Sequence, residues 1–142
     1  MLIVEQTYKL ESSLEEVYKA ITDLKDYSWR SDIDKIRKID SKHFLEIEYG
    51  DKKKSAPDFI TFITVLRKTK DKAYDLNIVN NVMEGNVYIS MNQIDNKIEI
   101  TIKHEMDIGN KNKWFFKIGK TGIKSIQKRY ITDLKKKLAQ NE

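Results

Sequence analysis

The sequence predicts an α+β fold in which seven antiparallel strands form one sheet and a long C-terminal helix packs against it. Over most of the chain before Lys111, apolar residues alternate with polar ones, which is typical of half-buried strands. From Lys111 to Gln140 they recur at steps of three and four, which is typical of a helix with one apolar face. Such a helix needs a large apolar partner, and the strands would provide it.

The composition predicts one cytoplasmic domain that covers residues 1–142. The chain has 142 residues and no cysteine, which excludes a disulfide framework, a thiolate nucleophile and a Cys-based zinc site. The start of the chain reaches Glu5 too early for a secretory signal. No apolar run approaches the ~20 residues that a membrane span requires. We expect a monomer or a homodimer with no membrane span.

The net charge of +5 is unevenly distributed along the chain. Residues from Lys111 onward carry a balance of +8, and the rest of the chain carries −3. The excess lies on the outer side of the predicted helix, where lysines near the C-terminus interact favourably with the helix dipole. This distribution favours a solvated face over a nucleic-acid site, with an anionic partner or a peripheral anionic membrane surface as the alternative.

The N-terminal region predicts a strand followed by a helix. Alternation over Leu2–Leu10 predicts a half-buried strand that carries Gln6 on its apolar face. Helical periodicity then extends from Leu14 to about Lys25. Ser13 and Glu16 form a capping-box sequence, in which the hydroxyl of Ser13 accepts from a helix amide and Glu16 reaches back.

A second short helical element and six more strands are expected after this helix. Asp26–Asp32 is short and aromatic, and we interpret it as a brief helical turn plus a loop. Short turns between the later strands make consecutive strands antiparallel neighbours. The expected strands are Ile33–Asp40, Phe44–Tyr49, Phe59–Arg67 and those around Tyr74–Ile78, Gly85–Met91 and Ile98–Asp107.

The chain resembles the START-like superfamily, also called SRPBCC, which includes birch-pollen-allergen-like proteins and bacterial polyketide cyclase/dehydrase-like proteins. Glu11–Tyr18 is similar to the family's exit from the first strand into a helix, and Ile21–Asp23 with Tyr27–Trp29 is similar to its short aromatic segment. The resemblance covers essentially the whole chain. It implies a helix-grip fold, in which a curved seven-stranded sheet wraps around the terminal helix. It also implies a cavity that binds apolar or amphipathic small molecules, and a minority of branches catalyse reactions on them.

His104 is the most distinctive candidate residue, because it shares the apolar face of its strand with Ile100 and Ile102. A buried imidazole needs a hydrogen-bond partner, which Gln6 or a tyrosine hydroxyl could supply. His104 is then a satisfied core residue, a polar anchor for a ligand, or a catalytic base. With two histidines and no cysteine we recognise no triad and no metal-ligand set, so neither a metal nor a cofactor is expected.

Tyrosines, glycines and apolar residues complete the predicted cavity lining. A tyrosine suits a mixed cavity wall as well as a core edge. Glycines on the inward helix face leave room either for close helix–sheet contact or for a ligand. Tyr27 and Trp29 either gate the cavity or cover the core. The predicted lining comprises Gln6, Tyr8, Tyr27, Trp29, Tyr49, Tyr74, Ile89, Met91, Ile102, His104, Phe115, Gly119, Gly122, Ile126 and Tyr130.

Three functions remain open at this point. The first is binding of a hydrophobic or amphipathic small molecule between the sheet and the C-terminal helix, with no evident catalytic machinery. The second is a polyketide cyclase/dehydrase-like enzyme in which His104 or a tyrosine transfers protons. The third is an interaction module that uses the basic helix face at Lys117, Lys124 and Lys128.

Overall fold

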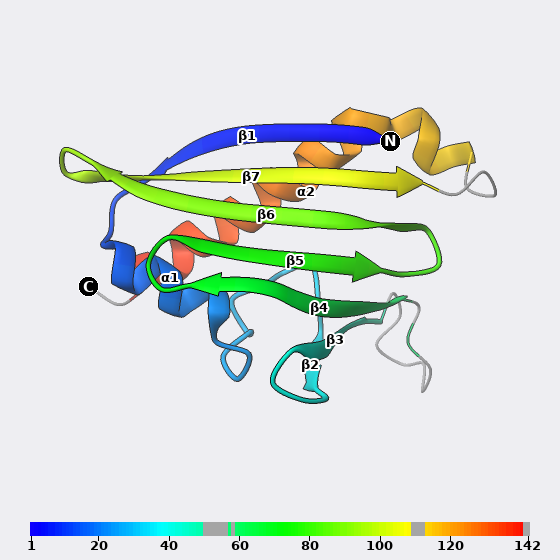
Figure 1. Cartoon of the computed structure of the whole chain (residues 1–142), viewed down its shortest axis with the longest axis horizontal. Helices are drawn as coiled ribbons and strands as arrows, with labels where there is room; N and C mark the ends of the chain where they lie inside the picture. The colour runs from blue at the N-terminus through cyan, green and yellow to red at the C-terminus, as the bar shows by residue number, and fades with distance from the viewer. Residues whose placement is uncertain (50–56, 58, 109–112, 141–142) are drawn as a thin grey trace.

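The computed structural model describes residues 1–49, 57, 59–108 and 113–140, and their side chains except those of 108 and 113–118. Over these residues the chain forms seven strands and two helices, in the predicted order except for the second short helix (Figure 1). The strands are β1 Leu2–Leu10, β2 Lys35–Lys38, β3 His43–Glu48, β4 Phe59–Thr69, β5 Ala73–Val79, β6 Met83–Ile94 and β7 Lys97–Ile108. The helices are α1 Leu14–Thr22, between β1 and β2, and α2 Lys113–Ala139 after β7.

All seven strands belong to one curved antiparallel sheet, which confirms the predicted α+β helix-grip architecture. The order across the sheet is β1-β7-β6-β5-β4-β3-β2. Each strand from β2 to β7 pairs with its neighbour in sequence, and β1 returns to pair with β7. In that last pair Val4 lies opposite His104 and Leu10 lies opposite Ile98. The β6–β7 turn contains Asp95 at a positive φ of 55°, which agrees with the turn predicted at Asp95-Asn96.

The N-terminus of α1 is capped by Ser13, as predicted. The Ser13 hydroxyl accepts a hydrogen bond from the backbone N–H of Glu16 at 3.1 Å. The side chain of Glu16, however, accepts from the hydroxyl of Ser12 at 2.9 Å. The helix ends at Thr22, earlier than predicted, because the chain turns to an extended conformation at Asp23.

The second short helix expected between the first two strands is absent, so that part of the prediction was wrong. Within Asp26–Asp32 the chain forms a turn in which the N–H of Arg30 donates to the carbonyl of Tyr27 at 3.0 Å. The indole N–H of Trp29 donates to the backbone carbonyl of Asp26 at 3.0 Å. Side-chain hydrogen bonds to nearby backbone thus replace the repeated bonds of a helix.

α2 is not continuous, although the sequence predicted one unbroken helix. Gly119 interrupts it with φ 49° and ψ −130°, a conformation that only glycine adopts readily. A Cβ at Gly119 would have no heavy atom within 4 Å, so the glycine meets a backbone requirement and not a shortage of space. Beyond this break the buried face also differs from the predicted stripe, because Ile126 is 39% exposed while Gln127 is buried.

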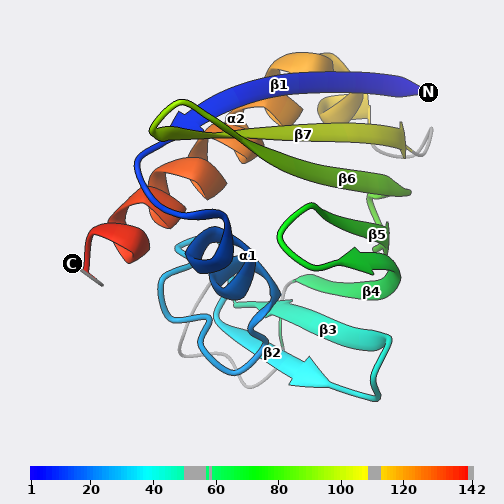
Figure 2. The ribbon, with the colours of Figure 1, turned by 60° about the vertical axis from the view of Figure 1, so that its left-hand side comes forward.

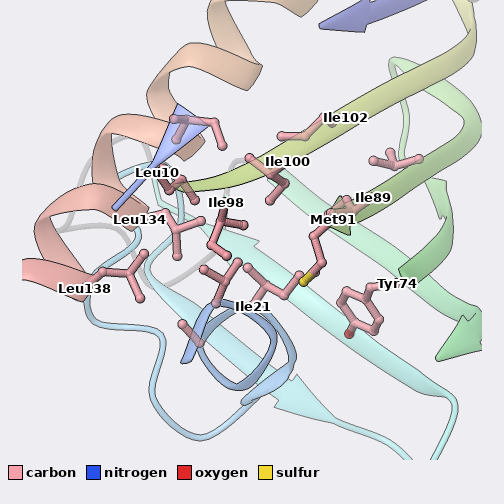
Figure 3. Close-up of a cluster of buried hydrophobic side chains, with 14 residues drawn as sticks. Leu10, Ile21, Tyr74, Ile89, Met91, Ile98, Ile100, Ile102, Leu134 and Leu138 are labelled. Carbon is pink, nitrogen blue, oxygen red and sulfur yellow. The ribbon is translucent and has the colours of Figure 1, made fainter. Parts of the chain in front are cut away.

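The main hydrophobic core fills the space between the sheet, α1 and the C-terminal part of α2 (Figure 3). Alternate residues of β7 face this core, as their period of two predicted. α2 packs on β1, β7 and α1, and it lies on the same side of the sheet as α1 (Figure 2). The core contains Leu10, Val17, Ile21, Tyr74, Ile89, Met91, Ile98, Ile100, Ile102, Ile131, Leu134 and Leu138.

Candidate functional site

A cavity of about 550 Å³ lies between the sheet, the segment 20–36 and α2. Strands β3 to β7 contribute one wall, because the helix contacts the β1–β7 edge and not the whole width of the sheet. The volume falls within the roughly 300–1,000 Å³ that is usual for small-molecule sites. The apolar wall includes Phe44, Ile63, Leu76, Ile78, Val87, Ile89, Ile102 and Ile123.

Eight of the predicted residues line this cavity. They come from the turn after α1, from three strands and from α2, so the fold brings together positions that are far apart in the sequence. Ile126 lies at the rim, because it lines the cavity and is also 39% exposed. The eight are Tyr27, Trp29, Tyr74, Ile89, Ile102, His104, Ile126 and Tyr130.

Six predicted residues lie elsewhere, and Phe115 lies outside the described side chains. Met91 is buried in the main core, against which Tyr8 packs. Tyr49 follows the end of β3, whose cavity-facing residues are Phe44, Glu46 and Glu48, so the predicted face of this strand was wrong by one residue. The lining also excludes Gln6, Gly119 and Gly122.

A buried polar cluster forms where α2 crosses β1 and β7. The side-chain nitrogen of Gln127 lies 2.9 Å from Nδ1 of His104 and donates to the backbone carbonyls of Val4 and Ile102, both at 3.2 Å. The hydroxyl of Tyr8 donates to the side-chain oxygen of Gln127 at 3.2 Å. The partner of His104 is therefore Gln127, and not Gln6 or a tyrosine as the sequence suggested.

Burial keeps His104 neutral at physiological pH. Its side chain is 8% exposed, and burial lowers the pKa of its imidazole from 6.5 to about 4. The ring therefore carries no charge over the range in which most histidines titrate.

A second polar cluster surrounds Arg30, which also lines the cavity. Its guanidinium donates two hydrogen bonds to the carboxylate of Asp32, both at 2.8 Å, and one to Glu46 at 3.0 Å. The same group lies 5.9 Å from the ring centre of Trp29 and 5.0 Å from that of Tyr130. An arginine held this way joins the turn after α1 to β3 and α2.

The charges in this cluster stabilise each other. Burial opposes the charge of Arg30, but the carboxylates of Glu46 and Asp32 outweigh it and hold the guanidinium pKa above its usual value. Burial raises the pKa of Asp32, but its hydrogen bonds with Arg30 bring the pKa below the usual range. Burial also raises the hydroxyl pKa of both Tyr74 and Tyr130 well above 10.

Three further residue pairs hold the segment after α1 against α2. The carboxylate of Asp133, only 7% exposed, accepts from the N–H and the hydroxyl of Ser31 at 2.8 and 2.7 Å. Arg129 donates to the hydroxyl and the carbonyl of the same serine. Lys137 pairs with Asp26 at 2.6 Å. One wall of the cavity is thus fixed by polar contacts.

Sequence reasoning missed Arg30, Glu46, Gln127 and Asp133. Gln127 had a usable signal, because it lies four residues from both Ile123 and Ile131 on a helix and is therefore a polar residue within an apolar stripe. Glu46 follows Phe44 at the two-residue spacing of one strand face. The pairing of Arg30 with Glu46 had no local signal, since the two come from separate elements.

The basic face of α2 is present at the positions that can be described. Lys124 and Lys128 are exposed, whereas the side chain of Lys117 lies outside the described part. Among the described residues, no three His, Cys, Asp or Glu side chains are grouped as metal ligands would be. Neither helix, over the residues described, is long and apolar enough to cross a membrane.

Solved structures share this fold over the whole chain. A conserved protein from Geobacillus kaustophilus superposes with a TM-score of 0.79 at 16% identity, covering 98% of this chain and 96% of that one. A START superfamily protein from Mycobacterium smegmatis gives 0.76 at 10% identity over all of both chains. DynU16, from the dynemicin biosynthetic locus, gives 0.74 at 12% identity, covering 100% of this chain but 49% of that one.

These similarities establish the fold and nothing finer. No family model and no curated protein matches the sequence. The resemblance to the START-like superfamily, inferred from Glu11–Tyr18 and the order of elements, is confirmed at the level of the fold. Identities of 10–16% leave ligand and activity to be argued from this chain's own residues.

Proposed function

We propose that this protein binds a small apolar or amphipathic molecule in the cavity between the sheet and α2. The observation that carries this proposal is the cavity itself: about 550 Å³, mostly apolar, with two polar clusters in its lining. Such a combination is usual for small-molecule sites, where apolar walls supply affinity and a few polar groups fix orientation. The START-like fold supports the proposal by analogy.

The pKa shifts favour binding over acid–base catalysis. A general acid or base works best with a pKa near the operating pH. In this cavity every resolved shift leads away from neutrality: burial takes His104 down to about 4, ion pairing lowers the pKa of Asp32, and burial raises that of Tyr74 and Tyr130. We therefore rank a polyketide cyclase-like enzyme second.

Native mass spectrometry on freshly purified protein tests the proposal, with two matched variants. Ile126→Trp places a larger side chain at the cavity rim, and Ile94→Trp makes the same change at a 45% exposed position that does not line the cavity. We expect wild type and Ile94→Trp to carry a co-purified molecule or to bind an added bicyclic hydrocarbon such as tetralin. Ile126→Trp should lose most of this binding.

Two results would refute the binding proposal. One is unliganded wild-type protein that shows no interaction with tetralin or with a panel of lipids and polyketides. The other is equal loss of binding in both tryptophan variants, because that would place the ligand outside the cavity.

A further inference from the structure

One ring nitrogen of His104 has no hydrogen-bond partner among the described residues. Its Nδ1 faces Gln127, and no described residue donates to or accepts from its Nε2. The side chain lines the cavity. Within the described part of the chain, one side-chain polar atom is both inaccessible to solvent and without a hydrogen-bond partner, and it belongs to Asp71. Nε2 of His104 also lacks a partner, so it must be accessible to solvent. It therefore opens onto the cavity.

Gln127 determines which ring nitrogen carries the proton. Its side-chain nitrogen faces the carbonyls of Val4 and Ile102, and its oxygen receives the hydroxyl of Tyr8. Exchanging the two ends of the amide would set its oxygen against two carbonyl oxygens, so the orientation is fixed. An amide nitrogen donates and does not accept. The amide nitrogen shares its two hydrogens among the two carbonyls and Nδ1 of His104, and a hydrogen on Nδ1 would point at these hydrogens. Nδ1 is therefore unprotonated, and the proton of the neutral ring lies on Nε2.

The other charges in the cavity argue against an anionic ligand. Among the described residues, five carboxylates and two guanidinium groups line it, and one of the carboxylates, that of Asp26, is paired with Lys137. Arg30 is already bonded to Asp32 and Glu46, and Arg129 to Ser31. Both guanidinium groups are thus already engaged by the protein, whereas an uncharged oxygen can accept from the neutral N–H of His104. The five carboxylates belong to Asp23, Asp26, Asp32, Glu46 and Glu48.

We propose that His104 donates its Nε2–H to the ligand, which is therefore an uncharged, largely apolar molecule with a carbonyl or ether oxygen at the end that lies against β7. Tyr8 and Gln127 position His104 by fixing its tautomer, and Gln127 also lines the cavity. This inference rests on the proposed binding function and specifies its ligand class.

Three bicyclic probes with one carbon skeleton test the inference: tetralin, tetralone and tetralin carboxylate. Calorimetric titration should show that wild-type protein binds tetralone roughly five- to tenfold more tightly than tetralin, the contribution of about one neutral hydrogen bond. The carboxylate should bind more weakly than tetralone. His104→Phe removes the donor while keeping a planar ring, and it should bring the tetralone-to-tetralin ratio close to one. His43→Phe alters the other histidine, which does not line the cavity, and should leave the ratio unchanged.

A nitrogen-15 NMR spectrum of wild-type protein gives a second readout that needs no variant to fold. We expect the imidazole of His104 to show a protonated Nε2 and an unprotonated Nδ1, with the Nε2–H resonance shifted by tetralone but not by tetralin. The opposite tautomer would overturn the inference. Tetralin binding with no advantage for tetralone would overturn it while leaving the binding function intact. Failure of all three probes would count against both.

Discussion

The buried neutral state of His104 predicts a specific loss of stability in mild acid. The pKa of its imidazole is about 4 in the folded protein and 6.5 in the unfolded reference. Since the folded pKa is the lower one, the unfolded chain takes up the proton first as the pH falls. The contribution to stability is therefore complete above about pH 6.5 and is lost progressively between there and about pH 4.

The magnitude follows from the separation of the two pKa values. One pKa unit corresponds to about 1.4 kcal/mol. Protonation of this imidazole in the unfolded chain alone lowers the free energy of unfolding by roughly 2 kcal/mol when the pH falls from about 7.5 to about 5. Other groups also titrate in this range, so the comparison needs a variant without the imidazole. His104→Asn removes the titration and keeps an acceptor near the position of Nδ1, so Gln127 retains a partner.

Urea unfolding at both pH values measures this quantity. We expect wild type to lose roughly 2 kcal/mol more than His104→Asn between about pH 7.5 and about pH 5. His43→Asn keeps His104 and should retain the wild-type loss. If His104→Asn lost as much stability as wild type, the imidazole would not be buried in its neutral form, and the assigned contact with Gln127 would be wrong.

Three further substitutions test separate parts of the structure. Gly119→Ala should lower the free energy of unfolding by about 1–3 kcal/mol, because alanine does not readily adopt the backbone angles of Gly119. Lys120→Ala, at the exposed neighbouring position, should change it by no more than about 0.5 kcal/mol. Equal effects of the two substitutions in urea titrations would refute a conformational role for the glycine. Arg30→Met leaves the carboxylates of Asp32 and Glu46 without their cation and should cost about 3–5 kcal/mol, and adding Glu46→Gln should recover part of this; no recovery would argue against the ion pair. Asp133→Ala removes the acceptor for Ser31 and should speed amide exchange at Ser31, while the exposed Lys136→Ala should not; unchanged exchange would contradict the contact.

Local patterns determined most of the fold. The strict alternation from Ile98 to Met106 predicted β7 and its buried face, because side chains of a strand point to opposite sides in turn. Ser13 predicted the start of α1, because its hydroxyl can accept a hydrogen bond from the backbone N–H three residues later, which has no partner within the helix. Short turns between strands made them antiparallel neighbours, so the sheet followed from the connections.

Burial alone was enough to place Ile102 and Tyr74 among the residues that line the cavity. Other positions of the predicted lining depend on small local changes in the backbone. The face of β3 depends on a one-residue register, which put Glu46 into the cavity and left Tyr49 outside the lining. Because α2 is broken at Gly119, one periodic stripe of apolar residues cannot describe the whole helix.

By itself, the sequence determined the elements, their order and the apolar face of most strands, because these depend on neighbours a few residues apart. Only the tertiary structure decided which polar groups meet. Gln127 reaches His104 because α2 crosses the sheet at that strand, and Arg30 reaches Glu46 because the turn after α1 folds over β3. Such contacts depend on sheet curvature and on how the elements pack, and these arise from the whole chain and not from any segment of it.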